Sequence, residues 1–77
     1  MPKTLAELAP GQRGTVAGYA QHDAFTQRLM ELGIIDGADI EVLRWAPTGD
    51  PIEVRVMGYA LSLRRAEAAL VHVDVLA

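Results

Sequence analysis

Apolar and polar residues alternate along much of this chain with the period of two that is typical of β-strands. The alternation is strict over Ile52–Val56 and Val71–Val75, where every second residue is Ile or Val. Less regular apolar segments bounded by turn residues predict further strands at 13–20, 39–46 and 60–64. The chain is therefore expected to consist mainly of short antiparallel strands.

The pattern changes to that of an α-helix over Asp23–Leu32. Asp23 has the short acceptor side chain that favours a helix N-cap, and Gly33 stands where a left-handed residue commonly ends a helix. Residues spaced i, i+4 and i+7 are expected to form the buried face, namely Phe25, Leu29 and Leu32. One helix therefore follows the first predicted strand.

Shorter elements connect the strands. Thr4–Leu8 has capping-box spacing and predicts one helical turn. Arg65–Ala69 is long enough to form another helical turn. Residues 47–51 are rich in Pro, Gly and Asp and predict a loop. Gly58-Tyr59 is expected to form a two-residue hairpin turn with Gly58 at its first central position.

The register of the hairpin around the 47–51 loop has two solutions. If Ala46 lies opposite Ile52, one face is shared by Ile40, Val42, Val54 and Val56. Leu43 and Trp45 then point to the opposite face, and a shift by one residue reverses the arrangement. We expect the first register, with a β-bulge near Leu43-Arg44 that would turn both sets inward.

These elements predict a mainly β fold: a small antiparallel barrel of about five strands with one short α-helix after the first strand. The 77 residues are expected to form a single domain, 1–77, because so short a chain cannot divide its apolar residues between two cores. Half of the residues are hydrophobic (51%), which is typical of globular rather than disordered chains.

Charge and composition exclude several functions. The net charge of −3 disfavours nucleic acid as a partner. There is no cysteine, and no apolar run approaches the length of about 18 residues that a membrane span needs. We therefore expect a cytoplasmic protein with no direct membrane insertion.

Catalytic chemistry has little support in the sequence. The chain has one lysine, Lys3, which does not follow a glycine-rich phosphate loop, and one serine, Ser62, which lies between two leucines. The acidic residues are spread along the chain without forming a pair. We expect a protein that is not an enzyme.

The candidate metal ligands are two histidines and the aspartates near them: His22 with Asp23, and His72 with Asp74. His22 precedes Asp23, and His72 alternates with Asp74 in the last predicted strand. Neither the spacing nor the ligand types complete a tetrahedral site within one chain. Two interpretations stay open: solvated histidines, or a surface site for a divalent ion that is shared between two chains.

The order of motifs resembles the FeoA family, small cytoplasmic proteins associated with FeoB ferrous iron transporters. The matching segments are Leu5-x-x-Leu8 with Pro10-Gly11-Gln12, Gln27-Arg28-Leu29-Met30-Glu31-Leu32-Gly33-Ile34, Ala46-Pro47-x-Gly49-Asp50-Pro51 and Leu61-Ser62-Leu63-Arg64-x-x-Glu67-Ala68. Thr48 departs from the pattern, which usually has a bulky apolar residue there. The resemblance covers nearly the whole chain.

This resemblance implies an SH3-like barrel and a non-enzymatic accessory role in ferrous iron uptake. The implied partner is the cytoplasmic, GTP-binding part of a FeoB-type transporter. The alternative is a metal-responsive sensor or carrier, because the domain also resembles the SH3-like module of iron-dependent and manganese-dependent repressors. No cofactor is required; a surface-bound iron or zinc ion and a homodimer stay open.

The expected partner surface combines exposed aromatic and arginine side chains with the loop of the most specific motif. Its residues are Trp45, Pro47, Gly49, Asp50, Tyr59, Arg64 and Arg65. The alternative is that Trp45 belongs to the core and that Pro47 to Pro51 form only a rigid turn.

Overall fold

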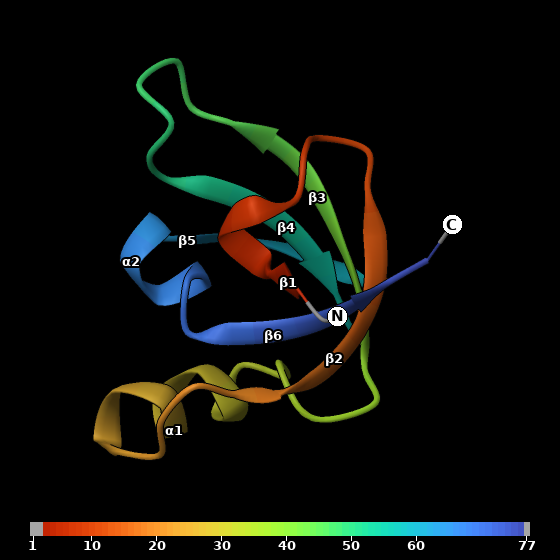
Figure 1. Ribbon diagram of the computed structural model, residues 1–77. Coiled ribbons are helices and arrows are strands. Elements are labelled where there is room, and N and C mark those ends of the chain that lie inside the picture. Colours follow the sequence, from red (N-terminus) through yellow and green to blue (C-terminus); the bar gives the residue numbers. More distant parts are fainter. Residues whose placement is uncertain (1–2, 77) are drawn as a thin grey trace.

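The fold is described by a computed structural model, in which residues 3–76 are placed (Figure 1). The elements in chain order are β1 (Lys3–Thr4), the 3₁₀ turn η1 (Leu5–Glu7), β2 (Arg13–Tyr19), α1 (Ala24–Glu31), β3 (Asp39–Trp45), β4 (Ile52–Val56), β5 (Tyr59–Leu63), α2 (Arg65–Ala68) and β6 (Val71–Val75). Every predicted strand and helix is present, and β4 and β6 have the predicted ends.

The strands form one antiparallel sheet with the order β1-β6-β2-β3-β4-β5. The expectation of about five strands misses β1, whose two residues pair with Val73 and His72 of β6. Two residues are too short to show a periodic pattern. Figure 1 shows the sheet bending around a shared interior, with α1 below β6 and with η1 and α2 close together at one side.

The core lies inside this bend and is built from aliphatic side chains of the strands, of η1, of α1 and of the segments that connect them. Its fully buried members include Leu5, Leu8, Val16, Leu29, Ile34, Ile40, Val42, Ile52, Val54, Val56, Leu63, Val71 and Val73. The face predicted from Ile40, Val42, Val54 and Val56 is therefore the buried one. Burial of such aliphatic side chains is the main stabilising contribution in a chain this short.

The β3–β4 register differs slightly from the expected one. Trp45, rather than Ala46, lies opposite Ile52, and a shift between Val42 and Arg44 marks the predicted bulge. The bulge places Trp45 on the same side of the sheet as Ile52, because directly opposed residues share a face. Trp45 lies at the end of the sheet, however, and 38% of its surface stays exposed.

Helix α1 has the predicted caps but not the predicted buried face. Asp23 accepts a hydrogen bond from the Thr26 backbone N–H at 3.0 Å, and Gly33 has φ +104°. The Ile34 N–H donates to the Leu29 carbonyl at 3.2 Å, which completes a Schellman motif.

The buried residues of α1 are Thr26 and Leu29, whereas Phe25 and Leu32 are exposed. The expected buried face is therefore confirmed at Leu29 and wrong at Phe25 and Leu32. The helix has only eight residues and covers one end of the sheet, so a narrow strip of its surface reaches the core. Thr26 can occupy that strip because its hydroxyl is satisfied by Asp23.

The β4–β5 turn is also displaced by one residue from the expected position. Val56 pairs with Tyr59, so the two central residues are Met57 and Gly58, not Gly58 and Tyr59. Both have positive φ, +53° and +82°, as a type I′ hairpin turn requires. Tyr59 is consequently the first residue of β5.

Candidate functional site

The loop at residues 46–51 is held in one shape by its own backbone. The Ala46 N–H donates to the Pro51 carbonyl at 3.0 Å, and the Gly49 N–H donates to the Ala46 carbonyl at 2.7 Å. The Thr48 hydroxyl donates to the Asp50 carbonyl at 3.1 Å. The loop that joins β3 to β4 is therefore ordered by local hydrogen bonds.

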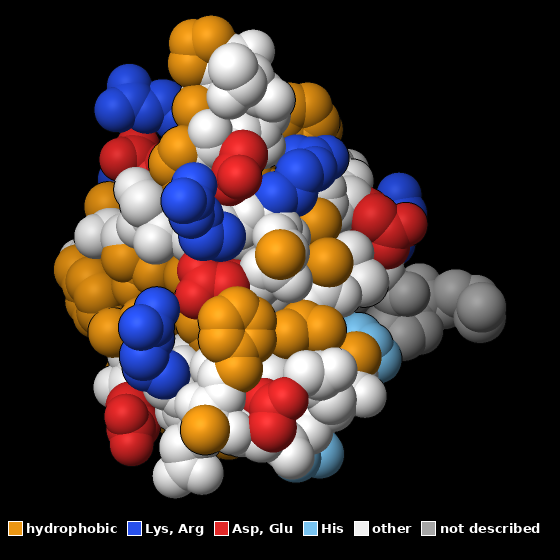
Figure 2. All heavy atoms as spheres, turned by 90° about the vertical axis from the view of Figure 1, so that its left-hand side faces the viewer, with side chains coloured by type: hydrophobic (Ala, Val, Ile, Leu, Met, Phe, Trp, Pro, Cys, Tyr) orange, Lys and Arg blue, Asp and Glu red, His pale blue; other side chains and the backbone are white. Residues whose placement is uncertain are grey.

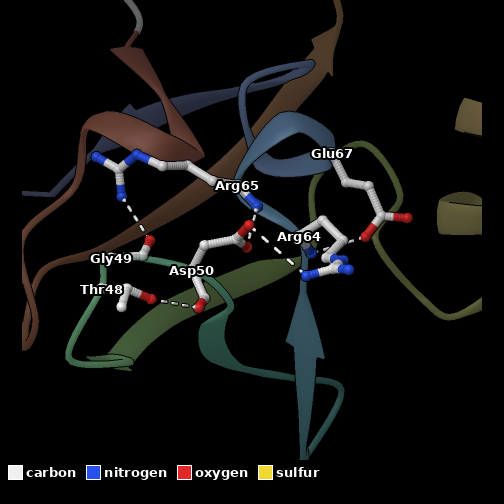
Figure 3. A network of polar contacts seen from close by, with 6 residues as sticks. All are labelled: Thr48, Gly49, Asp50, Arg64, Arg65 and Glu67. Carbon is white, nitrogen blue, oxygen red and sulfur yellow. Dashed lines mark hydrogen bonds and ion pairs between the residues drawn. The ribbon is translucent and has the colours of Figure 1, made fainter.

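Arg65, at the start of α2, attaches this loop to the rest of the protein (Figure 3). Its guanidinium donates to the Gly49 carbonyl at 3.1 Å and to the Ala6 carbonyl in η1 at 3.2 Å. Its backbone N–H donates to Asp50 Oδ1 at 3.0 Å, and the guanidinium carbon lies 5.3 Å from the centre of the Trp45 ring. One side chain therefore joins the loop, η1 and the end of β3.

A series of polar contacts continues from the loop toward α1. Asp50 Oδ2 lies 3.7 Å from Arg64 Nη1, and the Arg64 N–H donates to Glu67 Oε1 at 2.8 Å. Glu67 Oε2 in turn lies 3.3 Å from Arg28 Nη2 of α1. Figure 2 shows the basic and acidic side chains interspersed on this face.

Glu67 differs from the other charged residues in this series of contacts because its side chain is almost completely buried. Its two oxygens contact α1 and the start of α2, so a single carboxylate links the two helices. Arg28 and Arg64 both extend into solvent. Arg28 supplies the charge that faces Glu67, because the contact from Arg64 is a backbone N–H. Removing the Arg28 guanidinium would leave Glu67 buried without its compensating charge, which is costly.

A surface hollow of about 380 Å³ lies beside the loop. Trp45, Pro47 and Pro51 are apolar residues of its lining, and Arg44, Glu53 and Ser62 are polar ones. Arg44 and Glu53 form an ion pair at 3.0 Å. An apolar wall with a few polar groups is a suitable surface for a partner's side chain.

Of the candidate partner residues, the structure brings six together and separates one. Trp45, Pro47, Gly49, Asp50, Arg64 and Arg65 lie at the end of the sheet where β4 begins and β5 ends. Tyr59 begins β5 and so lies about 13 Å along the strand from that end. Its hydroxyl donates to the carbonyl of Leu32, at the end of α1.

The candidate metal ligands do not gather into one site. Within residues 3–76, no three His, Asp or Glu side chains are close enough together to hold an ion. Asp23 accepts hydrogen bonds from the Thr26 backbone and from Gln21 Nε2, and the Thr26 bond is the main cause of its lowered pKa. His72 is half-buried in β6 opposite Gly18, and Asp74 lies opposite Thr15.

Neither helix among residues 3–76 is long and apolar enough to cross a membrane. A family model described as the FeoA domain matches residues 3–75.

The chain belongs to the FeoA family.

One relative of this FeoA domain is a fusion of Fe(2+) transport protein A with the Fe(2+) transporter FeoB in Porphyromonas gingivalis. The two are 35% identical over 72 residues, which make up 94% of the present chain but only 8% of the fusion protein. The chain therefore spans less than a tenth of the length of that relative.

Solved structures of FeoA proteins have the same fold. A FeoA-like protein from Clostridium acetobutylicum is 36% identical with a TM-score of 0.92, over 99% of this chain and 88% of that one. FeoA from Stenotrophomonas maltophilia, complexed with zinc and described as a procaryotic SH3 domain protein, is 33% identical with a TM-score of 0.80, over 92% and 88%. The expected family and SH3-like fold are thus confirmed.

Proposed function

We propose that this FeoA domain is a non-enzymatic, cytoplasmic accessory protein of ferrous iron uptake, and that it acts by contacting the cytoplasmic GTP-binding part of a FeoB-type transporter. The observation that carries the proposal is the fusion in Porphyromonas gingivalis, where both proteins share one chain. Fusion keeps two modules at high effective concentration, which favours modules that bind each other.

The surface around the 46–51 loop supports this role. Arg64 is largely exposed, and its ion pair with Asp50 is long, at 3.7 Å. Such a pair contributes little to stability and exchanges readily for a carboxylate on a partner. Trp45 and the two prolines of the hollow supply rigid apolar area beside it.

The experiment is a calorimetric titration of the FeoA domain into the purified cytoplasmic domain of a FeoB-type transporter. Arg64→Glu should weaken binding about tenfold and reduce its dependence on salt, because the loss of a rim cation slows association. Arg55→Glu is the matched control, since Arg55 has the same charge and a similar exposed ion pair, with Glu41 at 3.6 Å.

Circular dichroism of both variants is the control for folding. Equal affinities for the parent and Arg64→Glu would exclude the loop surface. Absence of binding by the parent would contradict the proposed function itself.

A second candidate function is binding of a divalent metal ion at the surface, as in a sensor or carrier. The zinc complex of the Stenotrophomonas maltophilia relative favours it. His22 and His72 are the candidate ligands, completed by water or by carboxylates of a second copy, since one chain supplies no cluster of three within residues 3–76.

Calorimetry with Fe²⁺ and Zn²⁺ separates the two functions. Stoichiometric, sub-micromolar binding that is lost in His22→Gln or His72→Gln would favour the sensor or carrier. If metal addition produces no heat and no change in oligomeric state, the metal function is excluded.

A further inference from the structure

Four exposed apolar side chains lie along α1 and at the β4–β5 turn that meets the end of this helix. Their exposed fractions are 44% for Phe25, 39% for Leu32, 63% for Met57 and 45% for Tyr59. We call them the helix–hairpin patch.

Two contacts and the spacing of α1 define the patch. The Tyr59 hydroxyl donates to the Leu32 carbonyl. A Cβ atom on Gly33 would lie 2.9 Å from Met57 Cγ, so the Met57 side chain lies directly on the end of α1. Phe25 is seven residues before Leu32, which places both on the same side of the helix. Little conformational entropy would be lost when a partner covers a surface held in this way.

The fold does not explain the residue at position 57. The position has φ +53°, where Asn, Asp or Gly is favoured and a side chain such as methionine is strained. The methionine nevertheless exposes most of its surface. A strained, exposed apolar residue that contributes little to the core is better explained by contact with another molecule.

One arginine borders the patch on α1. Arg28 lies three residues after Phe25 and four before Leu32, and it exposes 69% of its side chain, whereas its partner Glu67 is buried. Aromatic residues, methionine and arginine are the types enriched at protein interfaces.

We propose that the helix–hairpin patch docks an apolar segment bordered by acidic residues, and that this segment belongs to the cytoplasmic part of the FeoB-type transporter. The inference rests on the proposed function and adds a second contact area to the 46–51 loop. The exposed guanidinium of Arg28 selects the acidic flank, and the four apolar side chains supply the centre of the contact.

Met57→Asn is the decisive variant. Asparagine suits the left-handed position and creates an Asn-Gly turn, so the variant should be at least as resistant to urea as the parent. In a titration against the transporter's cytoplasmic domain, its affinity should fall about tenfold. A structural role for Met57 would instead lower both stability and affinity.

Leu76→Asn is the matched control. Leu76 is 51% exposed, and its N–H donates to the Arg13 carbonyl at the start of β2, whereas α1 follows the end of that strand. Its substitution should leave the affinity within about twofold of the parent. Leu32→Ser provides an independent variant within the patch and should weaken binding as Met57→Asn does.

Unchanged affinity of Met57→Asn and Leu32→Ser, with a parent that binds, would overturn the patch and leave the proposed function intact. A parent that does not bind overturns both. Ultracentrifugation supplies the remaining outcome: a parent dimer that Met57→Asn dissociates would assign the patch to a second copy of the chain and overturn the transporter segment.

Discussion

The two ends of the β4–β5 strand pair differ in what their side chains contact. At the end formed by the 46–51 loop, charged and polar groups are bonded within the chain, above all through Arg65. At the hairpin end, a two-residue turn exposes Met57 and Tyr59. The arginines and the loop glycine that stand out in the sequence thus have a structural explanation, whereas the largely exposed side chain of Met57 lacks one.

The comparison depends on α1 and the hairpin forming one unit, and Gly33→Val should break that unit with the largest effect. Valine is strained at φ +104°, and its Cβ would lie 2.9 Å from Met57 Cγ. The free energy of unfolding should fall by about 2–3 kcal/mol. Urea unfolding followed by circular dichroism measures it.

Gly37→Val is the control, because Gly37 has φ +87° with no atom within 4 Å of an added Cβ. Its loss in the free energy of unfolding should come from backbone strain alone and should be smaller than that of Gly33→Val. Equal losses would mean that contact between Met57 and the helix end is unimportant.

Arg65→Ala tests the opposite end of the strand pair. The variant removes hydrogen bonds to two carbonyl groups and the contact with Trp45, so stability should fall by about 1–2 kcal/mol. Hydrogen exchange of the Gly49 amide should accelerate, since the loop loses its attachment.

Arg65→Lys should recover only part of the effect, because an ammonium group cannot reach both carbonyls as the guanidinium fork does. An unchanged Gly49 exchange rate would mean that the loop is ordered without Arg65.

Much of this fold is predictable from the sequence, and the failures share a cause. Strict alternation predicts β4 and β6 with the correct ends, and Asp23 and Gly33 predict both caps of α1. These features depend on neighbouring residues. The buried face of α1 is not predictable in the same way, because it depends on where the helix meets the sheet.

The site shows the same limit. The arginines and the loop can be recognised from the sequence, but their pairing cannot: Arg28 and Glu67 are 39 residues apart, and Tyr59 bonds a residue 27 positions earlier. Glu67 lies within a recognisable motif, yet no local signal marks it as buried. Tyr59 and the loop share the residue types of a partner surface, but they lie at opposite ends of the β4–β5 pair.

Tyr59→Phe sharpens the comparison from the hairpin side with a smaller effect. Phenylalanine keeps the ring and removes only the hydrogen bond to the Leu32 carbonyl. The expected loss is about 0.5–1.5 kcal/mol in urea unfolding. Amide exchange at Gly33 should rise, whereas exchange at Gly49 should not change. A rise at Gly49 would show that the two ends are coupled and would weaken the distinction between them.

The smallest effect is expected at the other end of α1, and it appears only in acid. The Thr26 backbone N–H and Gln21 hold the pKa of Asp23 below its usual value, so the unfolded chain binds a proton at higher pH than the folded chain does. Stability from this carboxylate is therefore present above the unfolded pKa of about 4 and is lost as the pH falls through the lower folded pKa.

Asp23→Asn caps the helix comparably without titrating, so thermal melts should show a shallower loss of stability for the variant than for the parent between about pH 5 and 2. Glu7, whose pKa is also lowered, is unchanged in both proteins, and the difference between them isolates Asp23. Parallel pH profiles would mean that the cap acts only as a hydrogen-bond acceptor and that its charge contributes nothing to holding α1, and with it the helix–hairpin patch, in place.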